Sequence, residues 1–435
     1  MKGLFFALVL LTVLAVPRPG PAADPCLDCH AQKTPGLVAY WRASAHAVRK
    51  VGCIDCHGSD REANHAGRVT VDATVCGGCH NAALTTHRAS KHGAGLKAGM
   101  GCTRNKAKSD ERDKSCSLCH KTGSAQPIVQ VACAMFLAQS PAMQRQGCLA
   151  CHQVEVRCDS CHTRHGTDLS IARSPGVCGV CHMGPDHPQA EMWETSMHGV
   201  LYSQGRGTGA PACATCHMHG GSHDVSRGIS PDGPPDAARI SKERTFMLSI
   251  CAECHTPGMA ARSLADGDTI REQSGKIVAE ARAVVEDLQR EGLLSPAPSD
   301  RPPHPLAGNK FVIGPHMLYE DLSSVESLFF KLKQFYAPTT YKGAFHQNPD
   351  YAHWYGNAPM KLTLSEIKSE ASLLRQVQAL KKRVDNLAAV PGTGGAEVED
   401  MKRRLREIEE LRLKGEISAQ EYEKMKKQLL DEKGL

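Results

Sequence analysis

The sequence predicts a mainly α-helical chain with little β structure, made of an N-terminal region built on a repeated motif, a helical domain and a short helical hairpin. Three observations support this fold class. Cysteine and histidine are concentrated in a repeated motif within residues 26–255. Apolar residues recur at helical spacing in the stretches after residue 260. The charged C-terminal stretch carries residues that start and stop helices.

Residues 1–23 have the pattern of an export signal. Lys2 supplies the positive charge, residues 3–16 are apolar, and two alanines precede Asp24. The apolar run is short for a membrane span, and an anchor that stays uncleaved is the alternative. No later stretch reaches about 18 apolar residues, so we expect a periplasmic protein that is soluble after cleavage of the signal peptide.

Nine copies of Cys-x-x-Cys-His hold all but two of the 20 cysteines. The first five copies are Cys26, Cys29 and His30; Cys53, Cys56 and His57; Cys76, Cys79 and His80; Cys116, Cys119 and His120; and Cys148, Cys151 and His152. The other four are Cys158, Cys161 and His162; Cys178, Cys181 and His182; Cys213, Cys216 and His217; and Cys251, Cys254 and His255.

This motif is the attachment signature of c-type haem. The two thiols add to the two vinyl groups on one porphyrin edge, and the histidine that follows ligates the iron. Zinc sites and thioredoxin-like redox pairs are the alternatives, but neither needs a histidine after every cysteine pair. The motifs are too dense for ordinary cores, so we expect the porphyrins themselves to fill the interior of residues 24–260. Attachment outside the cytoplasm agrees with the export signal.

Thirteen histidines lie outside the motifs, and a low-spin electron-transfer haem needs a second strong ligand, usually histidine. These thirteen are His46, His65, His87, His92, His165, His187, His198, His219, His223, His304, His316, His346 and His353. His46 follows the first motif at the end of a predicted helix, residues 40–46. His165 lies three residues after His162, so ring geometry prevents both from ligating one iron, and His165 should serve a neighbouring haem.

Three helices are predicted after the motif region, in a domain at residues 261–390. They span residues 264–292, 316–336 and 361–389, with a Pro-rich linker at residues 295–305. The last of them carries apolar residues at alternating spacings of four and three, which is a two-heptad coiled-coil seam. We expect this seam to pair with another chain or to pack on the haem domain. Its residues are Leu373, Val377, Leu380, Val384 and Leu387.

Residues 391–435 are predicted to be a flexible break followed by a charged helical hairpin at residues 398–432. Gly415 ends the first helix, and Ser418 with Glu421 forms a capping box for the second. This tail resembles the SHOCT modules, which are small oligomerisation or tethering hairpins. The net charge is +6 with histidine neutral, but basic residues form no long run and do not interleave with aromatic residues. We therefore expect no nucleic-acid partner.

Several stretches around the motifs carry a resemblance that covers residues 24–390. They are Cys26–His30 with Tyr40–His46, Val51–His57, Gly147–His165, Cys178–His187, Ser196–Gly199, His346–Pro349 and Pro359–Met360. These stretches resemble the hydroxylamine oxidoreductase family of octahaem cytochromes c. The resemblance implies a mainly helical trimer with closely packed haems, one of which is five-coordinate and catalytic. By position, this haem belongs to Cys148, Cys151 and His152.

The resemblance also implies the other site residues. Asp186 and His187 match the pair above the catalytic haem, where a carboxylate and an imidazole can relay protons. The alternatives for this pair are a loop ion pair, or His187 as an axial ligand. The implied sixth ligands number seven, which with one open haem accounts for eight haems. They are His46, His65, His92, His165, His198, His223 and His346.

The Cys116 motif departs from the family pattern because it has no counterpart among the usual eight. It lies in an insertion at residues 93–130, and we expect it to bind a ninth haem, with His87 as a candidate ligand. The haem c content is therefore expected to be eight or nine per chain. In the alternative, four cysteines pair among themselves: Cys102, Cys116, Cys119 and Cys133.

A second departure bears on the direction of the reaction. In the oxidative family members, a tyrosine between the Asn-Pro and Pro-Met landmarks crosslinks to the catalytic haem of a neighbouring subunit. Here the segment at residues 350–358 is one residue shorter and places His353 or Trp354 at that position, with Tyr351 and Tyr355 out of register. It resembles members that lack the crosslink and run reductively. Loss of the crosslink also weakens one support for the trimer.

We therefore expect a periplasmic reductase of nitrite, hydroxylamine or both, which acts on a small inorganic nitrogen compound with Asp186, His187 and His353 as catalytic residues. Oxidation of hydroxylamine or hydrazine is the nearest alternative, and an electron conduit without a substrate is another. Reduction of sulfur oxyanions is a third alternative, for which the sequence shows no distinct feature. The expected redox partner is a small cytochrome or a membrane quinol-linked cytochrome.

Overall fold

The structure, a computed structural model, describes residues 25–94, 142, 154, 156–205, 209–229, 237–294, 323–388 and 395–431. No β-strand occurs in these ranges, which confirms the mainly α-helical class. The predicted signal peptide lies outside the described residues, as do the Cys116 and Cys148 motifs, Cys102 and Cys133. No helix in the described ranges is long and apolar enough to cross a membrane.

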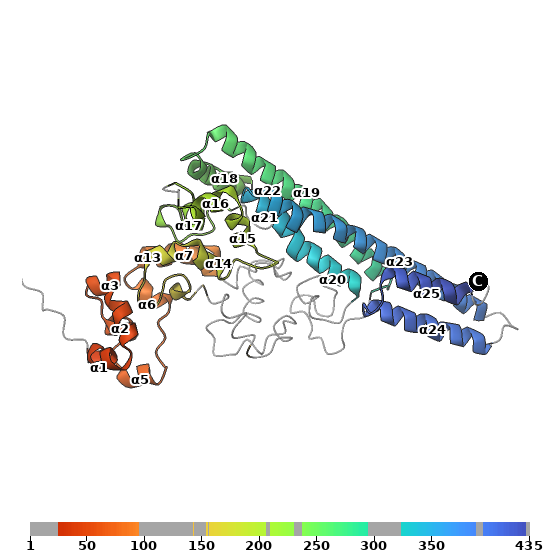
Figure 1. Cartoon of the computed structure of the whole chain (residues 1–435), viewed down its shortest axis with the longest axis horizontal. Helices are drawn as coiled ribbons and strands as arrows, with labels where there is room; N and C mark the ends of the chain where they lie inside the picture. The colour runs from red at the N-terminus through yellow and green to blue at the C-terminus, as the bar shows by residue number, and fades with distance from the viewer. Residues whose placement is uncertain are drawn as a thin grey trace, which may run out of the picture.

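The motif region consists of short helices joined by turns (Figure 1). The first eight are α1 (Pro25–Lys33), α2 (Pro35–Arg42), α3 (Ala45–Val48), α4 (Cys53–His57), α5 (Arg61–His65), α6 (Ala73–Gly77), α7 (Asn81–Ala89) and α8 (Lys91–Ala94). The next described elements are η5 (Cys158–Ser160), α13 (Leu169–Ala172), α14 (Pro175–Gly179), α15 (Gln189–Glu194), α16 (Met197–Ser203), α17 (Cys213–His217) and η6 (His219–Gly221).

Side-chain caps hold many of these helices, which are too short to be stable as isolated helices. Asp60 accepts a hydrogen bond from the Ala63 N–H at the start of α5, and Asp72 accepts from Thr74 N–H at the start of α6. The predicted helix over residues 40–46 is wrong as one element. It is broken at Ser44, whose buried hydroxyl caps α3.

Longer helices form the part that follows. They are α18 (Ala237–Cys251), α19 (Pro257–Arg290), α20 (Ser324–Lys331), η8 (Leu332–Tyr336), α21 (Ala337–Phe345), α22 (Pro349–Tyr351), η9 (Ala352–Asn357) and α23 (Ala358–Ala388), where η8 and η9 are π-helical. The helices predicted over 264–292 and 361–389 are confirmed. The described part of the stretch predicted over 316–336 is helical from residue 324, but π-helical from residue 332.

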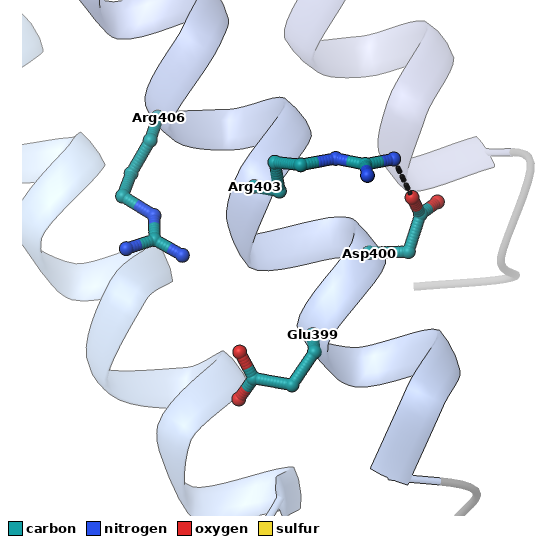
Figure 2. A pocket seen from close by; sticks show the side chains of 4 residues that line it. All are labelled: Glu399, Asp400, Arg403 and Arg406. Atoms are coloured by element: carbon teal, nitrogen blue, oxygen red, sulfur yellow. Dashed lines mark hydrogen bonds and ion pairs between the residues drawn. The ribbon is translucent and has the colours of Figure 1, made fainter.

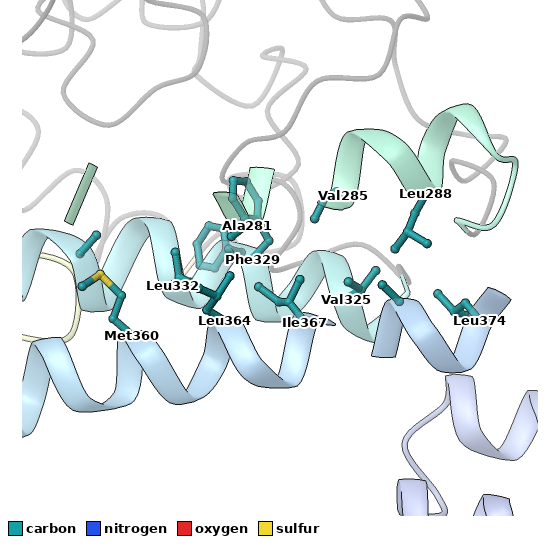
Figure 3. Close-up of a cluster of buried hydrophobic side chains, with 13 residues drawn as sticks. Ala281, Val285, Leu288, Val325, Phe329, Leu332, Met360, Leu364, Ile367 and Leu374 are labelled. Carbon is teal, nitrogen blue, oxygen red and sulfur yellow. The ribbon is translucent and has the colours of Figure 1, made fainter. Parts of the chain in front are cut away.

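An apolar core joins α19, α20 and α23, and Figure 3 shows its side chains meeting between the three helices. Val285 and Leu288 of α19, Phe329 of α20 and Ile367 of α23 are fully buried. α21 approaches its neighbours closely, because a Cβ on Gly356 would lie 2.5 Å from the Thr340 backbone nitrogen.

The C-terminal hairpin consists of α24 (Gly395–Leu413) and α25 (Ala419–Asp431), which confirms the predicted pair of helices. Gly415 has φ +74° between them. The capping box is also present, since the Ser418 N–H donates to Glu421 Oε2 over 2.8 Å and the Glu421 N–H donates to Ser418 Oγ over 3.2 Å.

This hairpin covers the apolar seam of α23. Leu373, Val377 and Val384 pack with residues of α24 and α25, among them the fully buried Tyr422. The seam is therefore covered by the hairpin, and not by another chain or by the haem domain as we expected. The reason is that the hairpin supplies an apolar face of its own within the same chain. The outer surface of the hairpin, away from the seam, is charged. A hollow on α24 is lined by Glu399, Asp400, Arg403 and Arg406 (Figure 2).

Candidate haem-binding sites and catalytic pair

Each motif in the described ranges forms one helical turn that is fixed by its own backbone. In four motifs, the histidine N–H donates to the carbonyl of the first cysteine over 2.9 Å: in those of His80, His162, His182 and His255. Side chains four residues apart lie on one face of a helical turn. The first cysteine and the histidine are therefore presented together, and neighbouring residues alone are enough to produce this arrangement.

Every motif histidine in the described ranges has a non-motif histidine beside it. The distances between ring centroids are 6.1 Å for His30 and His65, 6.0 Å for His80 and His46, 6.2 Å for His57 and His165, 6.1 Å for His162 and His223, 5.9 Å for His182 and His92, 6.4 Å for His217 and His346, and 6.0 Å for His255 and His198. These seven non-motif histidines are those that the family resemblance implied.

The distances fit an iron atom between the two rings. A bond from a metal to an imidazole nitrogen is about 2 Å long, so two bonds plus the two distances from nitrogen to ring centre give roughly 6 Å. Burial also favours the neutral, metal-binding form of the rings. It lowers the pKa of His92 to about 4, with the charge of His182 acting in the same direction, and burial with the charge of His346 lowers the pKa of His217 to about 4. The residues therefore fit haem c, and ligation of iron by each pair stays a prediction.

The motifs in the described ranges lie close to one another in a series. The Cys76 thiol lies close to that of Cys158, and the Cys178 thiol lies close to that of Cys213. Cys161 lies close enough to Cys178 for an electrostatic interaction, and so does Cys216 to Cys251. Neighbouring haem sites are therefore close to each other in the described part of the chain.

Three of the non-motif histidines are positioned in the same way, by a helix-capping serine that the sequence analysis missed. Each follows a buried serine by two residues: Ser44 before His46, Ser90 before His92 and Ser196 before His198. The three hydroxyls accept hydrogen bonds from the backbone N–H three residues on, over 3.2, 3.2 and 3.3 Å. Each serine thereby caps the short helix that carries the histidine. The recurring Ser-x-His pattern was the available signal.

Asp186 and His187 lie in the loop between α14 and α15, and the Nδ1–H of His187 donates a hydrogen bond to the Asp186 carboxylate. This bond, opposed by burial, raises the pKa of His187. Burial pushes the pKa of Asp186 upward, but the hydrogen bond and charge of His187 outweigh it, so the pKa falls. The loop is held in place by Glu191, which accepts from the Gly184 N–H over 3.0 Å. The two side chains are 52% and 39% exposed, so they can exchange protons with solvent.

The alternative role of His187 as an axial ligand can be compared with this geometry. Its ring lies 6.1 Å from that of His182 and is edge-on, at an interplanar angle of 81°. His182 also faces His92, and Nδ1 of His187 is occupied by Asp186. The structure thus gives His182 another partner, and it leaves His187 as one half of a hydrogen-bonded pair.

The third predicted catalytic residue, His353, has its described contacts with residues of its own helix rather than with this pair. It is exposed on η9, where its Nδ1 lies 3.4 Å from Asn357 Nδ2 and its ring contacts Trp354. Trp354 and Tyr355 are 64% and 62% exposed, and the Tyr355 ring stacks on Tyr351 at 4.6 Å. The segment that the resemblance assigned to crosslinking is therefore an exposed aromatic π-helix.

The Asn-Pro landmark has a structural role. Asn348 is buried, and its amide donates to the Met192 carbonyl over 2.9 Å and to Thr195 Oγ1 over 2.7 Å. Its Oδ1 accepts from the Tyr351 N–H over 3.0 Å and so caps α22. This side chain fixes the end of α21, and with it His346, against α15.

Two further non-motif histidines in the described ranges have other surroundings. Nε2 of His87 is buried and has no hydrogen-bond partner, while His219 lies 3.5 Å from Glu253 and contacts the Phe246 ring. The proposed partner of His87, the Cys116 motif, lies outside the described residues. The choice between a ninth haem and cysteine pairing therefore stays open.

Comparisons with known proteins agree with this geometry. A sequence family described as seven times multi-haem cytochrome CxxCH matches residues 49–208 and 202–302. A protein of Kuenenia stuttgartiensis described as a probable nitrite reductase-hydroxylamine oxidoreductase fusion protein is 26% identical over 82% of this chain and 52% of its own length. The chain thus spans about half of this relative.

Two solved structures share the fold. One is a chain of a reducing HAO-like protein complex of the same organism, with a TM-score of 0.65 and 24% identity, covering 83% of this chain and 87% of that chain. The other is a hypothetical multiheme protein, with a TM-score of 0.59 and 19% identity, covering 81% and 96%. The motif turns, the paired histidines and the family match lead to one conclusion: this chain belongs to the multihaem cytochromes with repeated CxxCH motifs, whose haem is of the c type.

Proposed function

We propose that this chain is a periplasmic oxidoreductase that reduces nitrite, hydroxylamine or both to ammonia. The motif cysteines would attach the haems, and the motif histidines with their seven partners would ligate them. Bound haem supplies electron transfer and an iron that substrate nitrogen can ligate. The similarity to a probable nitrite reductase-hydroxylamine oxidoreductase fusion protein supports this chemistry. A small cytochrome or a membrane quinol-linked cytochrome would deliver the electrons.

The observation that carries the proposal is the Asp186–His187 pair. Reduction of nitrite to ammonium takes up six electrons and eight protons and releases two waters, and reduction of hydroxylamine takes up two electrons and three protons and releases one water. Both reactions therefore need a group that donates protons repeatedly. Asp186 holds the His187 ring in one orientation and stabilises its protonated form. Nε2 can then donate a proton, and exposure to solvent allows the ring to be protonated again.

The reductive direction rests on the segment between Asn348 and Met360. No tyrosine occupies the register that the family resemblance associates with the oxidative crosslink. Tyr351, the last residue of α22, is stacked on Tyr355 of the π-helix η9, which exposes Trp354. A second candidate function is an electron conduit without a substrate. This electron-conduit function is favoured because every motif histidine in the described ranges has a second histidine beside it. None of these haem sites would therefore keep an open ligand position.

The test is ammonium formation by the haem-loaded protein, with nitrite and with hydroxylamine, driven by a strong low-potential electron donor. Hydroxylamine oxidation by an artificial acceptor is measured in parallel. We expect rapid ammonium formation and slow oxidation. The variant Asp186→Asn should lower kcat by about a hundredfold, the size typical of a lost acid–base group, while the haem absorption spectrum stays unchanged.

Three results would count against the proposal. Rapid oxidation without ammonium would reverse the direction of the reaction. No activity with either substrate would favour the electron conduit. Full activity in Asp186→Asn would show that the pair does not deliver protons.

A further inference from the structure

The side chain of Thr34 lies against the ring of His30, the histidine of the first motif. Thr34 Oγ1 lies 2.9 Å from His30 Nδ1, which is within hydrogen-bond distance. The same hydroxyl donates a long hydrogen bond of 3.5 Å to the His30 carbonyl, and the Thr34 N–H donates to that carbonyl over 2.8 Å. Both the side chain and the backbone of Thr34 are therefore tied to His30.

The Thr34 hydroxyl has no other duty in the helix that it begins. Thr34 is the N-cap residue of α2, where a threonine hydroxyl commonly accepts a hydrogen bond from the first turn. Here it makes no cap bond, and Pro35 follows it without an N–H. The Leu37 and Val38 N–H groups donate to the Thr34 carbonyl instead, over 3.1 and 3.3 Å. The hydroxyl is thus left to serve His30.

The hydrogen bonds around His30 suit an imidazole that ligates a metal. Such a ring binds the metal through one nitrogen and donates its other N–H to an acceptor, which fixes the tautomer and the ring orientation. Because Nδ1 of His30 is occupied by Thr34, Nε2 is the nitrogen left for iron. Nδ1–H then donates to Thr34 Oγ1, and the hydroxyl proton is directed to the His30 carbonyl.

The ring of His30 is nearly parallel to that of its partner His65, at an interplanar angle of 13°. A second paired histidine, His346, has an acceptor of another kind, because its Nδ1 lies 2.8 Å from the Lys342 carbonyl. A backbone carbonyl stays in place whatever the side chain, whereas the acceptor of His30 is a side chain. A single substitution can therefore remove the acceptor of His30 without changing the ring.

We propose that Thr34 is a positioning residue for His30 as an axial ligand, and that it lowers the reduction potential of the haem attached at Cys26 and Cys29. An acceptor at Nδ1 makes the ring a stronger electron donor, which stabilises ferric iron relative to ferrous iron. The helix α1 of this motif contacts α4 of the next motif. Thr34 would thereby set part of the driving force for electron exchange between the two sites. This inference rests on ligation of iron by His30 and His65, and not on the substrate.

The experiment uses the haem-loaded full chain without substrate. The low-spin electron paramagnetic resonance signal that is lost in His65→Ala identifies the haem of the first motif. The reduction potential and the g values of that haem are then measured by redox titration in Thr34→Val and in Thr34→Ser, which keeps a hydroxyl. The matched control is Thr74→Val, because Thr74 is exposed two residues before Cys76 and its hydroxyl bonds to no described residue.

We expect Thr34→Val to favour the reduced state of this one haem by about threefold, which equals a rise of roughly 28 mV at about 59 mV per tenfold change. The shift stays small because Thr34 is exposed, so water replaces part of the lost bond. The g values should change with it, since they depend on the angle between the two rings. Thr34→Ser and Thr74→Val should titrate as the unaltered protein does.

The inference is overturned if Thr34→Val leaves the potential and the g values unchanged, or if Thr34→Ser or Thr74→Val shifts them equally. It is also overturned if His65→Ala removes no low-spin signal, because the haem of the first motif would then lack the ligand on which the argument depends. A protein that forms no ammonium but shows the shift in Thr34→Val contradicts the proposed function alone. Rapid ammonium formation without that shift contradicts only the inference about Thr34.

Discussion

Replacement of His165 by alanine tests the pairing of histidines across the motifs. Its ring centroid lies 6.2 Å from that of His57, a distance that leaves room for an iron with a bond of about 2 Å on each side. His165 follows the Cys158 motif, the fourth motif after that of His57, so its assignment to His57 depends on the tertiary structure. Removal of the ring would leave the haem attached at Cys53 and Cys56 with one axial histidine.

The expected size of the effect follows from the count of pairs. His57 and His165 are one of seven such pairs in the described ranges, so one haem per chain should change from low-spin to high-spin. The other six pairs should keep their spectra. The measurement is the high-spin signal per chain in electron paramagnetic resonance and in near-infrared magnetic circular dichroism. Added imidazole should restore the low-spin form, because it can occupy the space of the missing ring.

The matched control is His219→Ala. His219 is a non-motif histidine in the same region, but it lies beside Glu253 and Phe246 rather than beside a motif histidine. This variant should show no new high-spin haem. The reasoning is refuted if His165→Ala leaves the spin states unchanged, or if both variants raise the high-spin signal equally.

Two further predictions concern caps and burial. Ser196→Ala removes the cap of α16, which should cost about 1 kcal/mol locally and speed hydrogen exchange at residues 197–203, whereas Ser196→Thr, which keeps a hydroxyl, should exchange like the unaltered chain. Equal exchange in both variants would show that the cap does not hold His198. Tyr422→Phe removes a buried hydroxyl that has no hydrogen-bond partner, so it should stabilise the hairpin by about 1 kcal/mol, measured as slower hydrogen exchange in α25. Faster exchange would reveal a partner for this hydroxyl.

Local features of this protein could be predicted from the sequence because neighbouring residues produce them. The motif turns are closed by bonds from the His80, His162, His182 and His255 N–H groups to a cysteine four residues earlier. The Ser418 and Glu421 capping box and the turn at Gly415 are equally local. The capping serine Ser44 is also a local signal, but it was overlooked. The single helix predicted over residues 40–46 is therefore two helices in the structure.

The identity of the seven non-motif histidines came from the family resemblance rather than from spacing. Spacing indicated only that His165 should serve another haem than that of His162. The structure then placed it beside His57, and it placed His346 of the helical domain beside His217 of the motif region. Ligation of iron by these pairs is still to be measured.

The cofactor class follows from the sequence alone, because the repeated cysteines and histidine act within one helical turn. Which elements meet depends on the packing of the folded chain. The hairpin covers the α23 seam within the chain, and Lys342 of α21 reaches the loop that carries Asp186 and His187. The physical reason is that a helical turn closes through bonds between adjacent residues, whereas contacts between distant segments depend on how whole helices pack.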